Sequence, residues 1–199
     1  MTASASIIVV GASWGGLAAL SRLLGSLPDD FGVPVAVVQH RSKNADALLA
    51  SLLQDVTGLR VVDVEDKEAL EPRSVYIAPA NYHMLVDWGH LTLTTDPLVR
   101  FSRPSIDVTF MSAADTYMTS TIGVVLTGAN DDGSRGLRHI VNRGGRAVIQ
   151  SPESAESRTM PEAARIAVPE ADVLPLDEIA AHLTSMVSAA QAKPHVRAV

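Results

Sequence analysis

The sequence has no cysteine, which excludes disulfide bonds, thiolate metal sites and a cysteine nucleophile. It is also short of positive charge: 16 lysine and arginine residues against 22 aspartate and glutamate residues give a formal net charge of −6. Nucleic-acid-binding proteins normally carry a basic face, so this balance argues against nucleic acid as a partner. The sequence has no apolar run of transmembrane length and no signal peptide. We therefore expect a cytoplasmic protein without direct membrane insertion.

The composition is that of a globular protein: 47% of the 199 residues are hydrophobic and 19% are charged, enough to build a sizeable core. Apolar strand-like runs alternate with amphipathic helical runs. This alternation predicts an α/β fold, doubly wound, with a mainly parallel sheet and helices on both faces. The expected strands are 6–10, 33–39, 60–64, 121–126, 146–149 and 173–174, and the expected helices are 15–24, 44–54, 105–118, 134–141, 160–167 and 177–190.

The pattern changes in the middle of the chain. Three short β runs, 74–78, 83–86 and 91–94, are separated by turn-like residues with no helical segment between them. We interpret them as an antiparallel hairpin insert. No internal repeat or long linker divides the sequence, so we expect one domain over residues 1–190 and a C-terminal tail over residues 191–199.

Ser13 lies at the first strand-to-helix turn, in Gly11-Ala12-Ser13-Trp14-Gly15. A serine flanked in this way presents its hydroxyl at the carboxyl end of a sheet, near backbone N–H groups of the following helix. That geometry suits a nucleophile that attacks a carbonyl and needs its oxyanion stabilised. Glycine-rich turns also cradle phosphates or only close a tight turn, so this segment alone leaves three interpretations.

Two more reactive groups follow predicted strand ends. His40 comes directly after the strand 33–39, and Asp131 and Asp132 come shortly after the strand 121–126. Carboxyl ends of parallel strands share one rim, where histidine can take the serine proton while a carboxylate orients the imidazole. The chain order Ser, His, Asp differs from that of α/β-hydrolases and argues against an ordinary member of that fold.

The chain resembles the catalytic domain of CheB-type protein-glutamate methylesterases. Eight segments in family order carry this resemblance: Gly11-Ala12-Ser13-Trp14-Gly15-Gly16, Gln39-His40, Tyr76-Ile77-Ala78-Pro79, His83-Met84, Arg103-Pro104-Ser105-Ile106-Asp107, Leu126-Thr127-Gly128, Asp132-Gly133 and Met160-Pro161. Together they are far more specific than any single motif.

The resemblance implies that Ser13 is the nucleophile, His40 the general base and acid, and Asp132 the orienting carboxylate. Asp132 is preferred to Asp131 because the family's acid directly precedes the glycine, and position 131 is usually asparagine. The implied reaction is hydrolysis of glutamate γ-methyl esters on chemoreceptors, which releases methanol, and some members also deamidate receptor glutamines. No metal and no organic cofactor is implied. The implied partners are the methylated cytoplasmic helices of chemoreceptors and a separate response-regulator or methyltransferase protein of the signal-transduction phosphorelay.

Several features depart from the family pattern. Most members carry an N-terminal receiver domain, whereas this sequence starts at the first catalytic strand, so we expect either a stand-alone member or a fragment without that control. Trp14 replaces a threonine or serine, and Ala129 replaces a methionine whose backbone N–H helps to form the oxyanion hole in the family. Arg41 and Lys43 follow His40, where cations would suit an acidic partner surface but are equally typical of solvated positions.

Other segments have structural interpretations beside functional ones. Ser105 suits a helix N-cap, and Arg103 either contacts substrate or serves the fold. Met160-Pro161 is typical of a helix start, with a role in lining the site as the minor alternative. His90, His139, His182 and His195 show no metal-ligand spacing.

Two other functions stay open. The turn at Ser13 is close to the Gly-x-Gly-x-x-Gly pattern of dinucleotide-binding proteins, so a Rossmann-like NADP-binding protein is the first alternative. Against it, Ser13 replaces the middle glycine and His40 stands where a ribose-binding acid belongs. The second alternative is a non-catalytic chemosensory interaction module.

Overall fold

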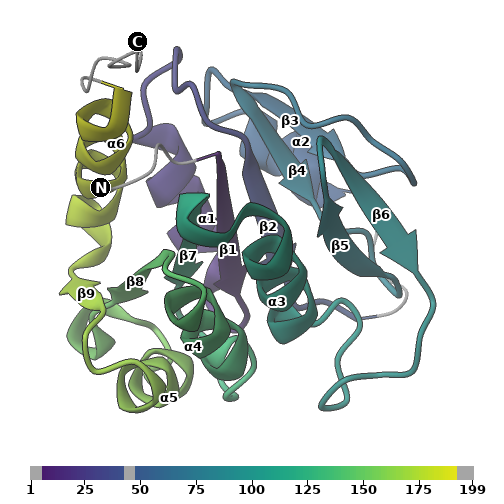
Figure 1. The fold of residues 1–199 in the computed structure, drawn as a ribbon. Coiled ribbons are helices and arrows are strands. Elements are labelled where there is room, and N and C mark those ends of the chain that lie inside the picture. Colours follow the sequence, from purple (N-terminus) through teal and green to yellow (C-terminus); the bar gives the residue numbers. More distant parts are fainter. Residues whose placement is uncertain (1–5, 43–47, 192–199) are drawn as a thin grey trace, which may run out of the picture.

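A seven-stranded sheet runs through the centre of the molecule (Figure 1). The structure, a computed structural model, describes residues 6–42 and 48–191. All neighbouring strands of the sheet are parallel, in the order β3-β4-β2-β1-β7-β8-β9. The strands are β1 (Ile7–Ala12), β2 (Val35–Gln39), β3 (Arg60–Asp63), β4 (Ser74–Ile77), β7 (Thr121–Val125), β8 (Arg146–Gln150) and β9 (Asp172–Leu174). The predicted α/β fold with a mainly parallel sheet is confirmed.

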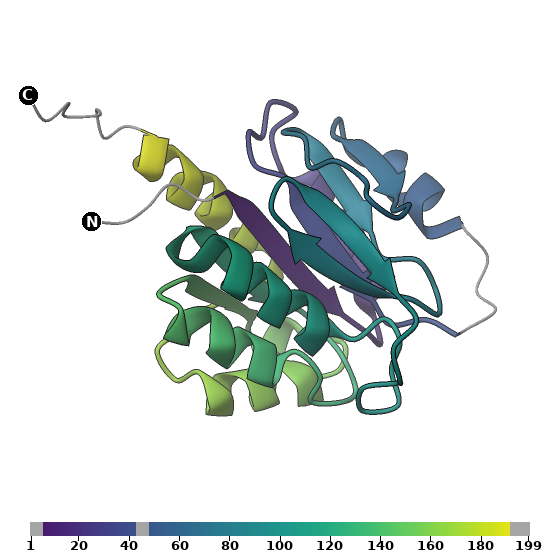
Figure 2. The same cartoon turned by 45° about the vertical axis from the view of Figure 1, so that its right-hand side comes forward.

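Helices cover both faces of this sheet. One layer holds α3 (Ile106–Tyr117), α4 (Ser134–Asn142) and α5 (Thr159–Ala167), which lie in a row in Figure 2, and the other holds α1 (Gly16–Gly25), α2 (Leu48–Gln54) and α6 (Leu176–Gln191). Two short 3-10 helices, η1 (Met118–Ser120) and η2 (Pro152–Ser154), complete the helical segments described. The sequence of β1 is apolar throughout because both of its faces are buried: Ile8 and Val10 pack into one core, and Ile7 and Val9 into the other.

A separate two-stranded antiparallel sheet, β5 (His83–Asp87) and β6 (His90–Thr94), lies beside α3. It is fastened to that helix by side-chain hydrogen bonds, among them Thr109 Oγ1 to the carbonyl oxygen of Met84 at 2.6 Å. The predicted hairpin insert is confirmed for these two strands. The interpretation of 74–78 as part of the insert is wrong, because β4 pairs in parallel with both β2 and β3.

The connection between β3 and β4 accounts for that error. Parallel neighbours are usually joined through a helix, and no helical pattern separates these two strands. The connecting residues instead bond to the hairpin: Leu91 N–H donates to Glu68 O at 2.7 Å, and Leu70 N–H donates to Gly89 O at 2.9 Å. An ordered crossover without a helix therefore replaces the usual one.

The other expected elements are present, with ends that differ by a few residues. The first residues of the expected helix 44–54 lie outside the described residues, and α2 is described from Leu48 onward. In the described part of the chain, none of the helices has both the length and the apolar character needed to cross a bilayer. The central strands β2, β1 and β7 end at one edge of the sheet, and the candidate site is built there.

Candidate active site

Ser13 and His40 emerge side by side at the ends of neighbouring strands. The last register pair of β1 and β2 is Ala12 with Gln39, and His40 N–H donates to Ala12 O at 3.0 Å just beyond it. On the other side of β1, Ser13 N–H donates to Thr127 O at 2.9 Å. The serine is thus held between the histidine and the turn that follows β7, as the strand-end argument predicted.

The backbone around Ser13 folds tightly into α1. Gly15 has a φ of 76°, a left-handed conformation that favours glycine, and Gly16 N–H donates to Ser13 O at 2.9 Å. The amides of Trp14 and Ala129 have no acceptor among the described residues. Trp14 directly follows the serine, and Ala129 directly follows Gly128, which closely approaches Ser13, so either amide could donate to an oxyanion formed there.

Gly128 allows the turn after β7 to approach the serine closely. A Cβ at this position would lie 3.0 Å from Ser13 Cβ and 2.5 Å from Met160 Cε. Met160 is buried, and its N–H donates to Gly128 O at 2.9 Å. Helix α5 begins at Thr159, next to the predicted helix start, so Met160 supports the turn behind the serine.

Asp132, the second predicted partner of His40, is fully buried and contacts the imidazole. Its Oδ2 lies 2.8 Å from His40 Nε2. The same carboxylate accepts four more hydrogen bonds, from Ser105 Oγ and from the backbone N–H groups of Ile106, Asp107 and Gly133, at 2.7–3.0 Å. Burial acts to raise the pKa of Asp132, but the hydrogen bonds from His40 and from the α3 backbone outweigh it and lower that pKa. The carboxylate is therefore ionised across the physiological pH range.

The His40–Asp132 contact assigns the imidazole protons. An ionised carboxylate only accepts hydrogen bonds, so Nε2 carries the proton and Nδ1 is the unprotonated nitrogen. The lone pair of Nδ1 accepts a long hydrogen bond from Asn130 Nδ2, at 3.4 Å. No hydrogen bond joins Ser13 Oγ to His40 in this structure; catalytic contacts are often long before substrate binds. Any base catalysis by His40 would use Nδ1, the reverse of the usual triad.

The structure separates the two adjacent aspartates. Asp131 is half exposed and forms an ion pair with Arg100, whereas Asp132 is the residue that meets His40. Ser105 occupies the N-cap position of α3 as predicted, but its hydroxyl makes no cap bond and donates to Asp132 instead.

Three site residues were missed by sequence reasoning. Gln39 donates from Nε2 to the carbonyl oxygens of both Ser13, at 2.8 Å, and His40, at 2.9 Å. Asn130 accepts from Asp132 N–H, and Asp107 accepts from Gly133 and Gly136 N–H at 2.9 and 2.7 Å. The only sequence signal was their place inside the matching segments or beside them.

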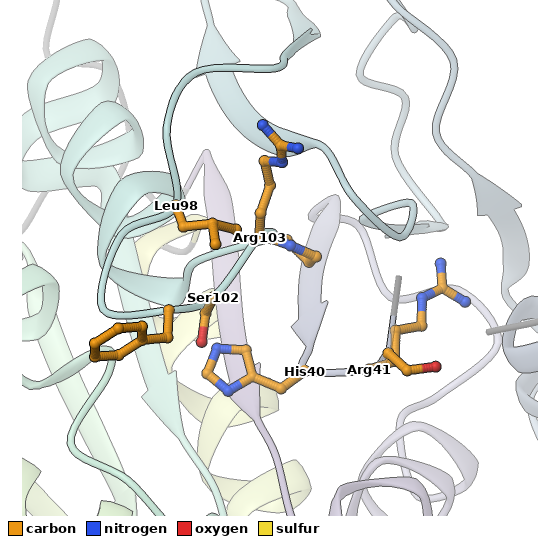
Figure 3. Close-up of a pocket in the computed structure, with 8 residues that line it drawn as sticks. His40, Arg41, Leu98, Ser102 and Arg103 are labelled. Atoms are coloured by element: carbon orange, nitrogen blue, oxygen red, sulfur yellow. The ribbon is translucent and has the colours of Figure 1, made fainter. Parts of the chain in front are cut away.

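A pocket of about 190 Å³ lies next to His40 (Figure 3). Its other lining residues come from the segment after His40 and from the loop before α3: Arg41, Ser42, Leu98, Phe101, Ser102, Arg103 and Pro104. The guanidinium groups of Arg41 and Arg103 point away from the imidazole. Arg103 donates to Asn81, Thr95 and Asp96, so it serves the loop, and Arg41 is mostly buried against Ala78 O and Asp63. Lys43 lies outside the described residues.

No group of three or more histidine or acidic side chains is placed to hold a metal ion within residues 6–42 and 48–191.

Comparisons with known proteins place these residues in context. Residues 8–183 match the family model of the CheB methylesterase. A Leptospira interrogans protein, with the provisional name protein-glutamate methylesterase/protein-glutamine glutaminase, is 41% identical over 87% of this chain and 90% of its own length. The protein-glutamate methylesterase FrzG of Myxococcus xanthus is 38% identical, and this chain spans about half of it, 54%.

A solved structure agrees with the sequence matches. The catalytic domain of the Thermotoga maritima CheB methylesterase superimposes with a TM-score of 0.87 at 33% identity, covering 92% of this chain and 100% of that domain. The proteins named here give no support to the nucleotide-binding alternative.

Proposed function

This chain belongs to the CheB methylesterase family, and on that premise we propose that it hydrolyses glutamate γ-methyl esters on chemoreceptor-like proteins, releasing methanol. The single observation that carries the proposal is the arrangement of Ser13, His40 and Asp132 at one rim of the sheet. Deamidation of glutamines at the same positions is a second reaction of the same site, because an amide differs from the ester only in its leaving group.

In the proposed reaction, His40 Nδ1 takes the proton of Ser13 as Oγ attacks the ester carbonyl carbon. The C=O π electrons move to oxygen, and the amides of Trp14 and Ala129 stabilise the resulting oxyanion. The intermediate collapses with cleavage of the C–OCH₃ bond, and His40 returns the proton so that methanol leaves. Water, deprotonated by His40, then attacks the acyl-serine, and Ser13 departs with the proton, leaving glutamate. Asp132 stabilises the imidazolium formed in both halves of the reaction.

The proposed substrate segments are the methylated cytoplasmic helices of a receptor, so the reaction would take place in the cytoplasm. The pocket beside His40 supports this proposal, because it offers a recess for substrate next to the proposed base. We propose residues 1–190 as the catalytic domain and residues 191–199 as a tail. A separate response-regulator or methyltransferase protein is the proposed regulatory partner.

The test is methanol release from a methylated receptor by wild type and by the Ser13→Ala and His40→Ala variants. Loss of either group should lower the rate by about 10³ or more, because the nucleophile and its base act as a unit. Circular dichroism of each variant controls for folding. Equal methanol release by wild type and Ser13→Ala would overturn the proposal.

A further inference from the structure

Gln39 links the two reactive segments of the site through one amide group. Its Nε2 donates to Ser13 O at 2.8 Å and to His40 O at 2.9 Å. We infer that Gln39 is a positioning residue that fixes the nucleophile relative to its base. The inference rests on the proposed esterase reaction, in which Ser13 Oγ and His40 Nδ1 must meet.

The orientation of this amide follows from its neighbours. Two carbonyl oxygens require a donor, so the NH₂ group faces them and Oε1 faces the other way. Oε1 is buried without a hydrogen-bond partner among the described residues. It lies against Gly16, where a Cβ would come within 1.8 Å of it. Buried acceptors are nearly always paired, and this glutamine leaves one unpaired while donating twice.

The two hydrogen bonds donated by the Gln39 side chain lie just beyond the last backbone hydrogen bond between β1 and β2. The last backbone bond between the two segments is His40 N–H to Ala12 O, one residue before the serine. Beyond it, Ser13 O accepts from Gly16 N–H within its own turn, which does not involve the histidine. Gln39 therefore supplies the cross-link nearest to the reacting groups.

This cross-link has a kinetic consequence. Ser13 Oγ and His40 share no hydrogen bond in the free protein, so their alignment depends on the backbone that carries them. A displacement of about 1 Å can reduce a catalysed rate about a hundredfold. Gln39 does not line the pocket beside His40, so its loss should lower kcat and leave KM nearly unchanged.

The test compares Gln39→Met with wild type. Methionine keeps the length of the side chain and removes both donors. We expect kcat for methanol release to fall about ten- to a hundredfold, with KM within about twofold. A fluorophosphonate that labels nucleophilic serines reports the same alignment without a receptor substrate, and labelling of Ser13 should slow in parallel.

Gln54→Met is the matched control. Gln54 also bridges backbone groups: its Nε2 donates to Leu59 O at 3.0 Å and its Oε1 accepts from Val61 N–H at 2.9 Å, away from the site. This variant should lose some thermal stability and keep wild-type kcat and labelling. It separates loss of a bridging amide in general from loss of the one at the site.

Gly16→Ala is a second route to the same defect, usable if Gln39→Met does not fold. Its new methyl group must displace the Gln39 amide, so kcat and labelling should again fall. In the double variant Gln39→Ala/Gly16→Ala the amide that the methyl group would displace is gone, and Ala12 Cβ, at 3.0 Å, is the close neighbour that remains. The Gly16→Ala substitution should then add less than about twofold to the effect of Gln39→Ala.

Wild-type kcat and labelling rate in Gln39→Met, or a raised KM with kcat unchanged, would overturn the positioning role. A wild-type chain that releases no methanol and takes no label would instead overturn the proposed function, and the positioning role with it.

Discussion

Asp132 shows how one side chain can determine which nitrogen of a neighbouring histidine is basic. Besides contacting the imidazole, its carboxylate accepts hydrogen bonds from three backbone N–H groups and a serine hydroxyl. Ser105 Oγ and the N–H groups of Asp107 and Gly133 all donate to Oδ1, so an asparagine at this position would have to place its oxygen there. Its NH₂ group would then replace Oδ2, facing both Ile106 N–H and His40 Nε2, and that nitrogen must become the unprotonated one.

We therefore predict that Asp132→Asn folds but loses activity. The proton of His40 moves to Nδ1, the atom that accepts the serine proton in the proposed reaction, and methanol release should fall by about 10⁴. Asp115→Asn is the control, since Asp115 also contacts a histidine, His139, at 2.8 Å, far along α3. Nitrogen NMR of the imidazole reports the tautomer directly. Wild-type activity in Asp132→Asn would refute the assigned role.

The residues that the sequence predicted and those it missed differ in kind. Ser13, His40 and Asp132 carry reactive groups directly after strands or in the turn that follows one, so topology alone brings them to one rim. Gln39 and Asp107 act through the direction in which their side chains point, and periodicity contains no information about that direction. Their positions in the matching segments were visible, but the contacts that give them roles were not.

At the scale of elements, an ion pair joins the loop before α3 to the turn after β7 that carries Asp131 and Asp132. Arg100 and Phe101 form the tip of this loop, both with positive φ, and Val99 and Ser102 close it with two backbone hydrogen bonds. Arg100 pairs with Asp131, next to Asp132. Phe101 is 97% exposed and Leu98 is partly exposed, both lining the pocket beside His40.

We predict that Arg100→Gln and Asp131→Asn raise KM for the receptor substrate and leave kcat unchanged. The pair is partly exposed and worth at most about 1 kcal/mol, so KM should rise about two- to fivefold and thermal stability should barely change. Arg138→Gln, which breaks a similarly exposed pair with Glu170, is the control and should leave KM unchanged. A fall in kcat with constant KM would contradict this role for the loop.

Elements could be predicted where hydrophobic pattern and packing agree. The central strands are apolar on both faces because helices cover both faces of the sheet. The alternation of strands and helices along the chain could be predicted from that pattern. Strand β4 was assigned to the wrong sheet because the run 74–78 was grouped with the two β runs that follow it, from which only turn-like residues separate it. The bonds that hold its helix-free connection, such as Leu91 N–H to Glu68 O, join residues whose proximity only the folded chain shows.

Across the whole molecule, two buried carboxylates join α3 and α4 in a reciprocal way, at the rim of the sheet where His40 lies. Asp107, in the first turn of α3, accepts N–H groups at the start of α4. Asp132, just before α4, accepts N–H groups at the start of α3. Their pKa values move in opposite directions: burial and the charge of Asp132 raise the pKa of Asp107 against its backbone hydrogen bonds, whereas hydrogen bonds lower that of Asp132.

Opposite shifts predict opposite effects of pH on stability. The lowered pKa of Asp132 gives stability that is present above the unfolded value, about 3.9, and is lost as pH falls through the folded value. The raised pKa of Asp107 gives stability that is present below about 3.9 and is lost as pH rises through its folded value. Asparagine does not titrate. The free energy of unfolding of Asp132→Asn, measured with denaturant, should therefore fall relative to that of wild type as pH rises up to about 3.9. Asp107→Asn should gain stability relative to wild type as pH rises above that value. Parallel pH curves for the two variants would contradict the opposed ionisation of this carboxylate pair.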